Sequence, residues 1–235
     1  YNGVVSIAGD FGSGNDTLTL YDGFALPVDV KGGSGVDTLN VNNTTMPSGN
    51  LTKDTVGTIT YKKFSTLNIF LGNIDNTFTI ASTAKGTTTK IETGAGNDTV
   101  YVQGTGGPTT VDTGQTGGGT VTIGTNLDKI KGALTLTGSS SSNLYVDDSG
   151  NASTTVKNGT LSTSSVSTSS VSGLGMVAGG ITFSGFAALE ISLGTGGSTF
   201  GIGDTNIDTI INGGVENDTI NLIDNHAHTT INGEG

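Results

Sequence analysis

Residues 87–102 of the chain read Thr-Thr-Thr-Lys-Ile-Glu-Thr-Gly-Ala-Gly-Asn-Asp-Thr-Val-Tyr-Val. Two short segments in which apolar and polar residues alternate flank a glycine-rich turn that ends in Asp98. Such alternation is typical of a half-buried β-strand, and glycine and aspartate are typical of tight turns. The stretch therefore predicts a strand, a turn and a second strand.

The same alternation recurs along the chain at a regular spacing. Two interleaved series of apolar residues mark the strand centres: Phe78, Val100, Val121 and Leu144 in one, and Ile69, Ile91, Val111 and Leu134 in the other. Two strands per coil of about 21 residues are typical of a parallel β-solenoid, in which each strand pairs with the equivalent strand of the next coil. We therefore predict an all-β fold, a parallel two-sheet β-solenoid (a β-roll or narrow β-helix).

The composition fits a fold with a thin core. Only 32% of the 235 residues are hydrophobic, whereas 40 are glycine. Stacked strands that each contribute a few apolar side chains can still fold with such a composition, although a thick globular core cannot form. No apolar run approaches the roughly 18 residues that a membrane span requires, so we expect no membrane span.

The charge balance is strongly acidic. Twenty acidic residues against 9 lysines and arginines give a net charge of −11, and the acidic residues are mostly aspartate. A chain of this charge repels nucleic acid and attracts cations, so no nucleic-acid partner is expected. Aspartate is favoured in turns and is common among calcium ligands.

A longer repeat overlies the coils. Residues 59–102 correspond to residues 181–222, and residues 28–41 correspond to residues 134–146. We attribute the change of offset between the two matches to a Ser/Thr-rich insertion at residues 152–180. The matches predict one continuous solenoid over residues 1–235, built from tandem units of about 120 residues.

The two ends of the chain suggest an internal fragment. The first residues lack the basic and apolar segments of a secretion signal, and the last five residues look like the start of another turn. We therefore expect the chain to be part of a longer tandem array.

Four glycine-rich turns end in an aspartate that is followed by threonine and an apolar residue. They occupy residues 12–18, 32–39, 94–100 and 213–220. The second turn fits the pattern G-G-x-G-x-D-x-U-x in full, where U is apolar, and Glu216 replaces the last glycine of the fourth. These turns resemble the calcium-binding repeats of RTX proteins, which form parallel β-rolls in secreted bacterial toxins, proteases, adhesins and S-layer proteins.

The resemblance implies that Ca²⁺ is held between turns of successive coils by backbone carbonyls and aspartate carboxylates. It assigns that role to Gly12, Gly14, Asp16, Gly33, Gly35, Asp37, Asp75, Gly94, Gly96, Asp98 and Asp218. RTX repeats follow one another without a break, whereas here only the turns that end at Asp16 and Asp37 stand on consecutive coils with both carboxylates present. The alternative is a metal-free turn in which Asp or Asn side chains accept hydrogen bonds from backbone amides.

Two smaller features concern modification and metal binding. Asn-x-Ser/Thr sequons make Asn43, Asn50, Asn151 and Asn158 speculative glycosylation sites. His226 and His228 face one side if they lie on a strand and would then form a metal-binding pair, but without a third ligand nearby an exposed turn is the preferred interpretation.

The predicted function is structural rather than enzymatic. The whole unit of about 120 residues also resembles the tandem arrays of very large bacterial surface proteins, which implies an extracellular or cell-surface location on a bacterium. We expect a fibre, a surface layer or an adhesin stalk that is rigidified by Ca²⁺, self-associates end to end or laterally, and has glycans as possible partners. One alternative is an RTX-type domain that triggers folding and secretion of a larger toxin or hydrolase. The other is a β-helical polysaccharide-active enzyme, which would need clustered acids beside a basic residue.

Overall fold

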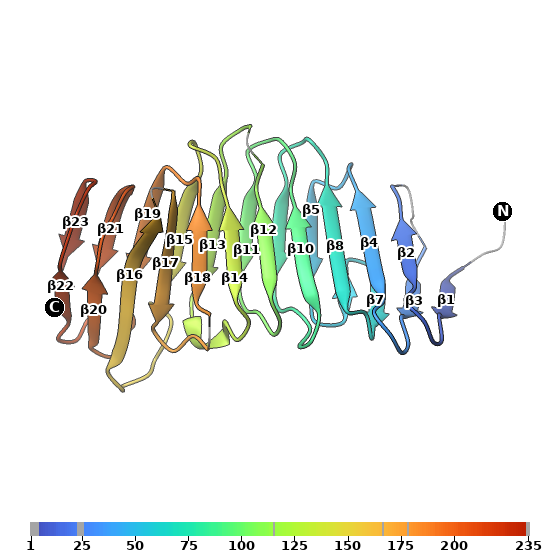
Figure 1. The fold of residues 1–235 in the computed structure, drawn as a ribbon, viewed down its shortest axis with the longest axis horizontal. Helices are drawn as coiled ribbons and strands as arrows, with labels where there is room; N and C mark the ends of the chain where they lie inside the picture. Colours follow the sequence, from blue (N-terminus) through green and yellow to red (C-terminus); the bar gives the residue numbers. More distant parts are fainter. Residues whose placement is uncertain (1–4, 23–25, 115, 166, 178, 234–235) are drawn as a thin grey trace.

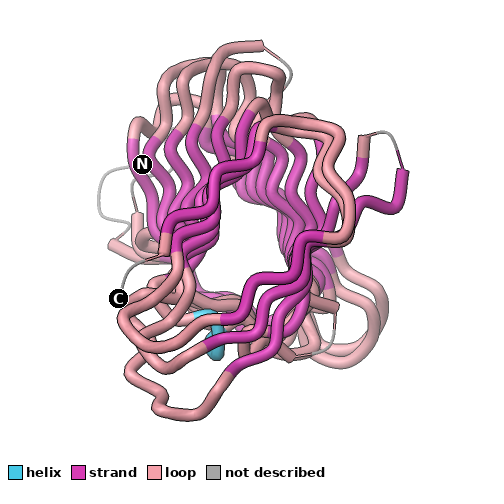
Figure 2. Tube along the Cα trace, turned by 90° about the vertical axis from the view of Figure 1, so that its left-hand side faces the viewer, coloured by secondary structure: helices cyan, strands magenta, loops and turns pink. Residues whose placement is uncertain are grey.

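The computed structural model describes residues 5–22, 26–114, 116–165, 167–177 and 179–233. Within these residues the chain forms two long β-sheets and one short 3-10 helix, η1 (Leu127–Lys129). The sheets face each other, and loops run along both edges (Figures 1 and 2). The predicted parallel two-sheet solenoid is confirmed.

The strands are most easily given sheet by sheet, in spatial order. The 12-stranded sheet of the described residues contains β1 (Ile7–Asp10), β3 (Val28–Lys31), β7 (Ile59–Lys62), β6 (Thr55–Val56), β5 (Ser48–Leu51), β9 (Thr77–Ile80), β11 (Thr99–Val102), β13 (Thr120–Gly124), β15 (Asn143–Asp147), β19 (Ala188–Ser192), β21 (Asp208–Asn212) and β23 (Thr229–Asn232). The 11-stranded sheet contains β2 (Thr17–Leu20), β4 (Thr38–Asn43), β8 (Thr66–Leu71), β10 (Thr88–Glu92), β12 (Thr109–Asp112), β14 (Leu134–Thr137), β18 (Ile181–Ser184), β17 (Thr168–Gly173), β16 (Lys157–Ser165), β20 (Ser198–Ile202) and β22 (Thr219–Leu222).

The chain passes between the sheets at two edges. We call the first edge the one whose turns lead from the 12-stranded to the 11-stranded sheet, and the second edge the one whose turns lead back. Each edge carries one turn per coil, so residues one coil apart lie next to each other along it.

The core consists of the inward-facing residue of each alternating pair. Phe78, Val100, Val121 and Leu144 stack in register on β9, β11, β13 and β15, as their spacing predicts, and each is at most 1% exposed. Burying one such side chain stabilises the fold by about 1.5–3 kcal/mol relative to leaving it exposed.

The second predicted series is correct except at its last member. Ile69, Ile91 and Val111 are in register on β8, β10 and β12, but Val111 pairs with Leu136. Leu134 pairs with Thr109 instead. The loop that contains η1 lengthens this coil, so a constant spacing placed the strand centre two residues too early.

Among the described residues, each sheet contains one strand that runs antiparallel to its neighbours. In the 12-stranded sheet β6 is antiparallel to both β5 and β7, and in the 11-stranded sheet β17 is antiparallel to both β16 and β18. The Ser/Thr-rich residues 152–180 therefore supply two strands of the sheet.

The strands that precede these two antiparallel strands share a packing detail. Gly49 of β5 pairs with Phe78 and Gly159 of β16 pairs with Phe200. A Cβ on either glycine would lie within 3 Å of that phenylalanine ring. Glycine thus lets the ring of the neighbouring strand lie across the backbone.

Matching strands of the two copies of the longer repeat lie in opposite sheets. β7 and β9 belong to the 12-stranded sheet, whereas β18 and β20, which carry the matching sequence, belong to the 11-stranded sheet. The copies are therefore offset by half a coil as well as by several coils. No helix among the described residues has the length and apolar character needed to cross a bilayer.

Candidate metal-binding turns and neighbouring polar clusters

The turns that end at Asp16 and Asp37 lie on consecutive coils of the first edge. Their backbones contact each other directly, since Ser34 N donates a hydrogen bond to Gly12 O at 2.8 Å. Gly33 has a φ of 111°, and a Cβ at this position would lie 2.1 Å from Gly12 O. The close approach of the coils therefore requires glycine here.

The carboxylate of Asp37 caps the backbone of the preceding coil. Its Oδ1 accepts a hydrogen bond from Asp16 N at 2.9 Å, and the residue is fully buried. In the other direction, Asn15 Oδ1 accepts a hydrogen bond from Val36 N at 2.9 Å. Both contacts belong to the amide-capping arrangement that is the metal-free alternative for these turns.

The turn that ends at Asp98 repeats this arrangement on the second edge. Asp98 Oδ1 accepts from Asn76 N at 2.9 Å, and Oδ2 accepts from the Thr93 hydroxyl at 2.6 Å. Asp75 Oδ1 accepts from Asn97 N at 2.8 Å. The register therefore places Asn76 one coil before Asp98, and Asp75 one coil before Asn97.

The pKa of Asp98 is raised above its usual value. Burial of the carboxyl is the main cause, and the negative charge of Asp75 acts in the same direction. The hydrogen bonds from Thr93 and Asn76 act in the opposite direction because they stabilise the carboxylate. Burial prevails, so the charged form of Asp98 is disfavoured relative to an exposed aspartate.

The turn that ends at Asp218 uses both carboxylate oxygens. Oδ1 accepts from Ser198 N at 2.7 Å and Oδ2 accepts from Gly214 N at 2.8 Å. This turn lies between β21 and β22 on the first edge, several coils from Asp37. The five predicted aspartates thus form three separate groups: Asp16 with Asp37, Asp75 with Asp98, and Asp218 alone.

Among the five aspartates, only those of the first group have buried carboxylate oxygens without a hydrogen-bond partner. The Oδ2 atoms of Asp16 and Asp37 are buried and have no hydrogen-bond partner among the described residues. Gly32 stands five residues before Asp37, as Thr93 stands five residues before Asp98. A side chain at Gly32 is excluded because its Cβ would lie 2.3 Å from Lys63 O, so no hydroxyl reaches Asp37.

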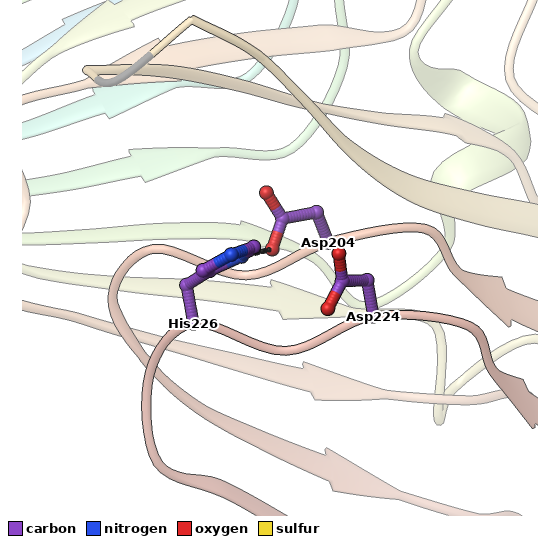
Figure 3. Close-up of side chains that lie close together, drawn as sticks. All are labelled: Asp204, Asp224 and His226. Atoms are coloured by element: carbon purple, nitrogen blue, oxygen red, sulfur yellow. Dashed lines mark hydrogen bonds and ion pairs between the residues drawn. The ribbon is translucent and has the colours of Figure 1, made fainter.

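A further acidic group contains a histidine (Figure 3). Asp204 follows β20, and Asp224 and His226 follow β22 one coil along. The His226 Nδ1 atom lies 2.8 Å from Asp204 Oδ1, and one ligand atom of each of the three residues lies within 4.8 Å of the others. His226 thus contacts a carboxylate of the neighbouring coil, a partner that its spacing from His228 did not indicate.

The pKa of His226 is raised by its hydrogen bond with Asp204 and by the negative charges of Asp204 and Asp224. The imidazole is exposed, and the carboxylates are exposed or half-buried. A histidine–aspartate ion pair between adjacent coils accounts for this geometry without an ion.

A lysine-centred cluster lies near η1. Lys157 Nζ lies 3.0 Å from Asp148 Oδ2 and 2.8 Å from Asp128 Oδ1. Asp148 also occupies a capping position, because its Oδ1 accepts from Leu127 N at 2.8 Å. No sequence motif indicates this cluster, because its three charged residues follow no glycine-rich turn.

The structure separates the four candidate glycosylation sites. Asn50 and Asn158 are exposed and Asn43 is half-buried. Asn151 is 3% exposed, and its side-chain amide donates hydrogen bonds to Asp128 and Asp148. In the folded chain Asn151 is therefore inaccessible to a glycosyltransferase.

Comparison of the chain with family models, with curated proteins and with solved structures yielded no match.

Proposed function

We propose that this chain is a structural solenoid of an extracellular bacterial surface protein, acting as a fibre, surface layer or adhesin stalk. The observation that carries the proposal is the unbroken strand pairing in both sheets, from β1 to β23 and from β2 to β22. Backbone hydrogen bonds and side-chain caps link coil to coil along the whole described length. Such an architecture extends by adding coils, which suits a spacer or a fibre.

Self-association is part of the proposal. The strands at each end of the two sheets have one hydrogen-bonded neighbour each among the described residues, so they offer free backbone groups. Beside them, Leu222, Ile223 and Ile231 are 48%, 79% and 43% exposed. Unpaired strand edges with apolar side chains favour end-to-end contact between copies.

The association test is sedimentation velocity over a concentration series. We expect the wild-type chain to form larger species as its concentration rises and Ile231→Lys to suppress them. Thr122→Lys, which places the same charge on the outer face of β13 in the middle of the solenoid, is the matched control. A wild-type chain that remains monomeric at every concentration contradicts end-to-end assembly.

We also propose that Ca²⁺ binds at the Asp16–Asp37 turns and rigidifies this end of the solenoid. The buried, unpartnered Oδ2 atoms of the two aspartates support this assignment, because a divalent cation with oxygen ligands would satisfy them. At Asp98 and Asp218 both carboxylate oxygens already accept hydrogen bonds, so we assign no ion there.

Thermal unfolding in EDTA and in Ca²⁺ tests the calcium proposal. We expect Ca²⁺ to raise the melting temperature of the wild-type chain and of Asp98→Asn, but not that of Asp37→Asn. An equal rise in melting temperature in all three proteins would place the ion elsewhere. No rise in any of them would contradict calcium binding. A chain that is unfolded in EDTA and folds only on adding Ca²⁺ favours the alternative RTX-type secretion domain.

A further inference from the structure

The Lys157 cluster brings together an amine and two carboxylates from different parts of the chain. Asp128 belongs to η1, Asp148 to the turn after β15, and Lys157 is the first residue of β16. The ammonium also donates to Leu174 O at 3.2 Å. Among these partners Asp148 is the carboxylate shielded from solvent, at 0% side-chain exposure against 47% for Asp128.

Lys157 differs from the other lysines of the chain. Its side chain is 12% exposed, whereas the other eight basic residues, which are all lysines, are exposed. The fully buried side chains of Leu127 and Leu174 belong to residues whose backbones contact the cluster. The amine of Lys157 and the carboxyl group of Asp148 are thus held in contact away from bulk water.

The carboxyl group of Asp148 is polarised on the side away from the amine. Its Oδ1 accepts hydrogen bonds from Leu127 N at 2.8 Å and from Asn151 Nδ2 at 3.2 Å, while Oδ2 faces Lys157 Nζ. Two donors aimed at one oxygen stabilise the negative charge that develops there when a nucleophile attacks the carbonyl carbon. The arrangement thus pairs a nucleophile with a polarised electrophile.

The geometry points to an intramolecular amide bond between Lys157 Nζ and Asp148 Cγ. A proton passes from the ammonium to Asp148 Oδ2, which gives a neutral amine and a carboxylic acid. The amine attacks Cγ, the Cγ–Oδ2 bond breaks, and the hydroxyl leaves with a proton from nitrogen as one water molecule. The step is a condensation that needs no oxidant, reductant or co-reactant.

Asp128 is positioned to relay the proton. Its Oδ1 lies 2.8 Å from Nζ, so it can accept the proton that nitrogen loses after the attack and return it to the departing hydroxyl. The hydrogen bond from Lys157 is the main influence that lowers the pKa of Asp128, and this keeps the group ionised and bound to the amine. Asn151 Nδ2 also holds Asp128, at 3.0 Å from Oδ2.

The fold supplies the driving force that dilute amines and carboxylates lack. Holding both groups in contact replaces a bimolecular encounter with an intramolecular one, which corresponds to effective molarities of about 10⁵–10⁸ M in well-oriented cases. The bond closes the loop between β15 and β16 covalently and is independent of the function proposed above.

Intact-mass measurement of the folded chain is the first test. We expect the wild-type mass to be lower than the sequence mass by one water, and Lys157→Arg, which keeps the charge and donors, to have its full sequence mass. Lys131→Arg, at an exposed lysine, is the matched control and should still lose one water. A wild-type chain that keeps its full mass after prolonged incubation overturns the proposal.

Tryptic digestion locates the bond. Lys157 is the last basic residue of the chain, so an unlinked protein yields separate peptides 132–157 and 158–235. Trypsin does not cleave after an acylated lysine, so the linked chain yields one peptide, 132–235, lighter by one water. A succinimide at an aspartate would also lose water, but it persists in Lys157→Arg and leaves cleavage at residue 157 intact, and this result overturns the proposal.

Two further variants test the assigned roles. Asp148→Asn should form the same amide with loss of ammonia instead of water. Asp128→Asn should close the bond about 100-fold more slowly, which is the usual size of a lost proton relay, and should be recovered as a mixture that converts with time. Closure at the wild-type rate in Asp128→Asn contradicts the role of Asp128.

Discussion

The turns that end at Asp37 and Asp98 carry nearly the same motif on opposite edges of the solenoid, yet their carboxylates differ in one contact. Both accept a hydrogen bond from a backbone amide of the preceding coil. Only Asp98 receives a second one, from Thr93, while Gly32 leaves the corresponding oxygen of Asp37 without a partner. At these two turns, the residue five positions before the aspartate thus decides whether its second carboxylate oxygen has a hydroxyl partner.

Asp148 extends the comparison to a third case. It caps Leu127 N in the same way, but its second oxygen faces Lys157 instead of a hydroxyl. One capping position therefore has three second partners: none, a neutral donor and a cation. The cap between coils is therefore the recurring geometry, and the partner of the second carboxylate oxygen sets the chemistry of each turn.

The largest effect on the free energy of unfolding is expected at Asp148. Relative to the chain before the proposed amide bond forms, Asp148→Ala removes the cap on Leu127 N and leaves a mostly buried Lys157 with one carboxylate partner, so we expect a loss of about 3–5 kcal/mol in unfolding free energy. Denaturant unfolding measures it. Asp147→Ala is the matched control, because Asp147 accepts one exposed hydrogen bond, from Ser149 N, and should cost less than about 1 kcal/mol. Equal losses for the two variants would contradict the special role of Asp148.

The direct comparison of the first two turns comes next. In EDTA, Asp98→Ala should cost about 2–3 kcal/mol because two hydrogen bonds to a buried carboxylate are lost. Asp37→Ala should cost about half as much, since it loses one hydrogen bond and also removes an unsatisfied oxygen. Chemical unfolding of both variants side by side gives the ratio. A greater cost for Asp37→Ala would break the comparison.

Thr93→Val makes the Asp98 turn resemble the Asp37 turn. Loss of the hydroxyl should cost about 1 kcal/mol and raise the Asp98 pKa further, because one cause that lowers it is gone. A carboxyl with a raised folded pKa contributes stability that is present below about pH 4 and is lost as pH rises through the folded value. The pH range of this loss should therefore extend upward in Thr93→Val. Unfolding curves from pH 3 to about pH 8 test this, and Asp98→Asn should remove the contribution of Asp98 to the slope.

The smallest effect is expected at the exposed pair of His226 and Asp204. The raised pKa of His226 means that its contribution is present below about pH 6.5 and is lost as pH rises through the folded value. The protection factors of amides in the last coil, which correct for the intrinsic pH dependence of hydrogen exchange, should therefore fall slightly as the pH rises through this range in the wild-type chain. The pH effect should disappear in Asp204→Asn. An unchanged pH dependence in that variant would show that the ion pair does not hold the last coil.

The regular strands of each coil could be predicted from the sequence, whereas the variable loop lengths and the antiparallel strands could not. Alternation and spacing predicted the two sheets and the stacking of Phe78, Val100, Val121 and Leu144, because inward residues must recur once per coil. The same argument misplaced Leu134, since loop length varies freely at the surface and the loop with η1 is longer. Antiparallel strands such as β17 were not predicted, because a Ser/Thr-rich segment is compatible with both a strand and a linker.

The candidate site was predicted in outline for a similar reason. The glycine-rich turns and their aspartates are visible as a local motif, and the amide-capping alternative describes the contacts of Asp37 and Asp98. The charged partner of each site residue comes from a different part of the chain. Lys157 is the partner of Asp148, and Asp204 is the partner of His226. Those contacts depend on the register between coils, which no local pattern specifies.

The half-coil offset between β7 and β18 has a consequence for anything that grips the molecule from one side. Loops with matching sequence therefore lie on opposite edges of the solenoid. A partner approaching this chain along one side therefore meets a given loop in only one of the two copies. Two partners that recognise the same loop in neighbouring copies would bind on opposite faces, without competing for space.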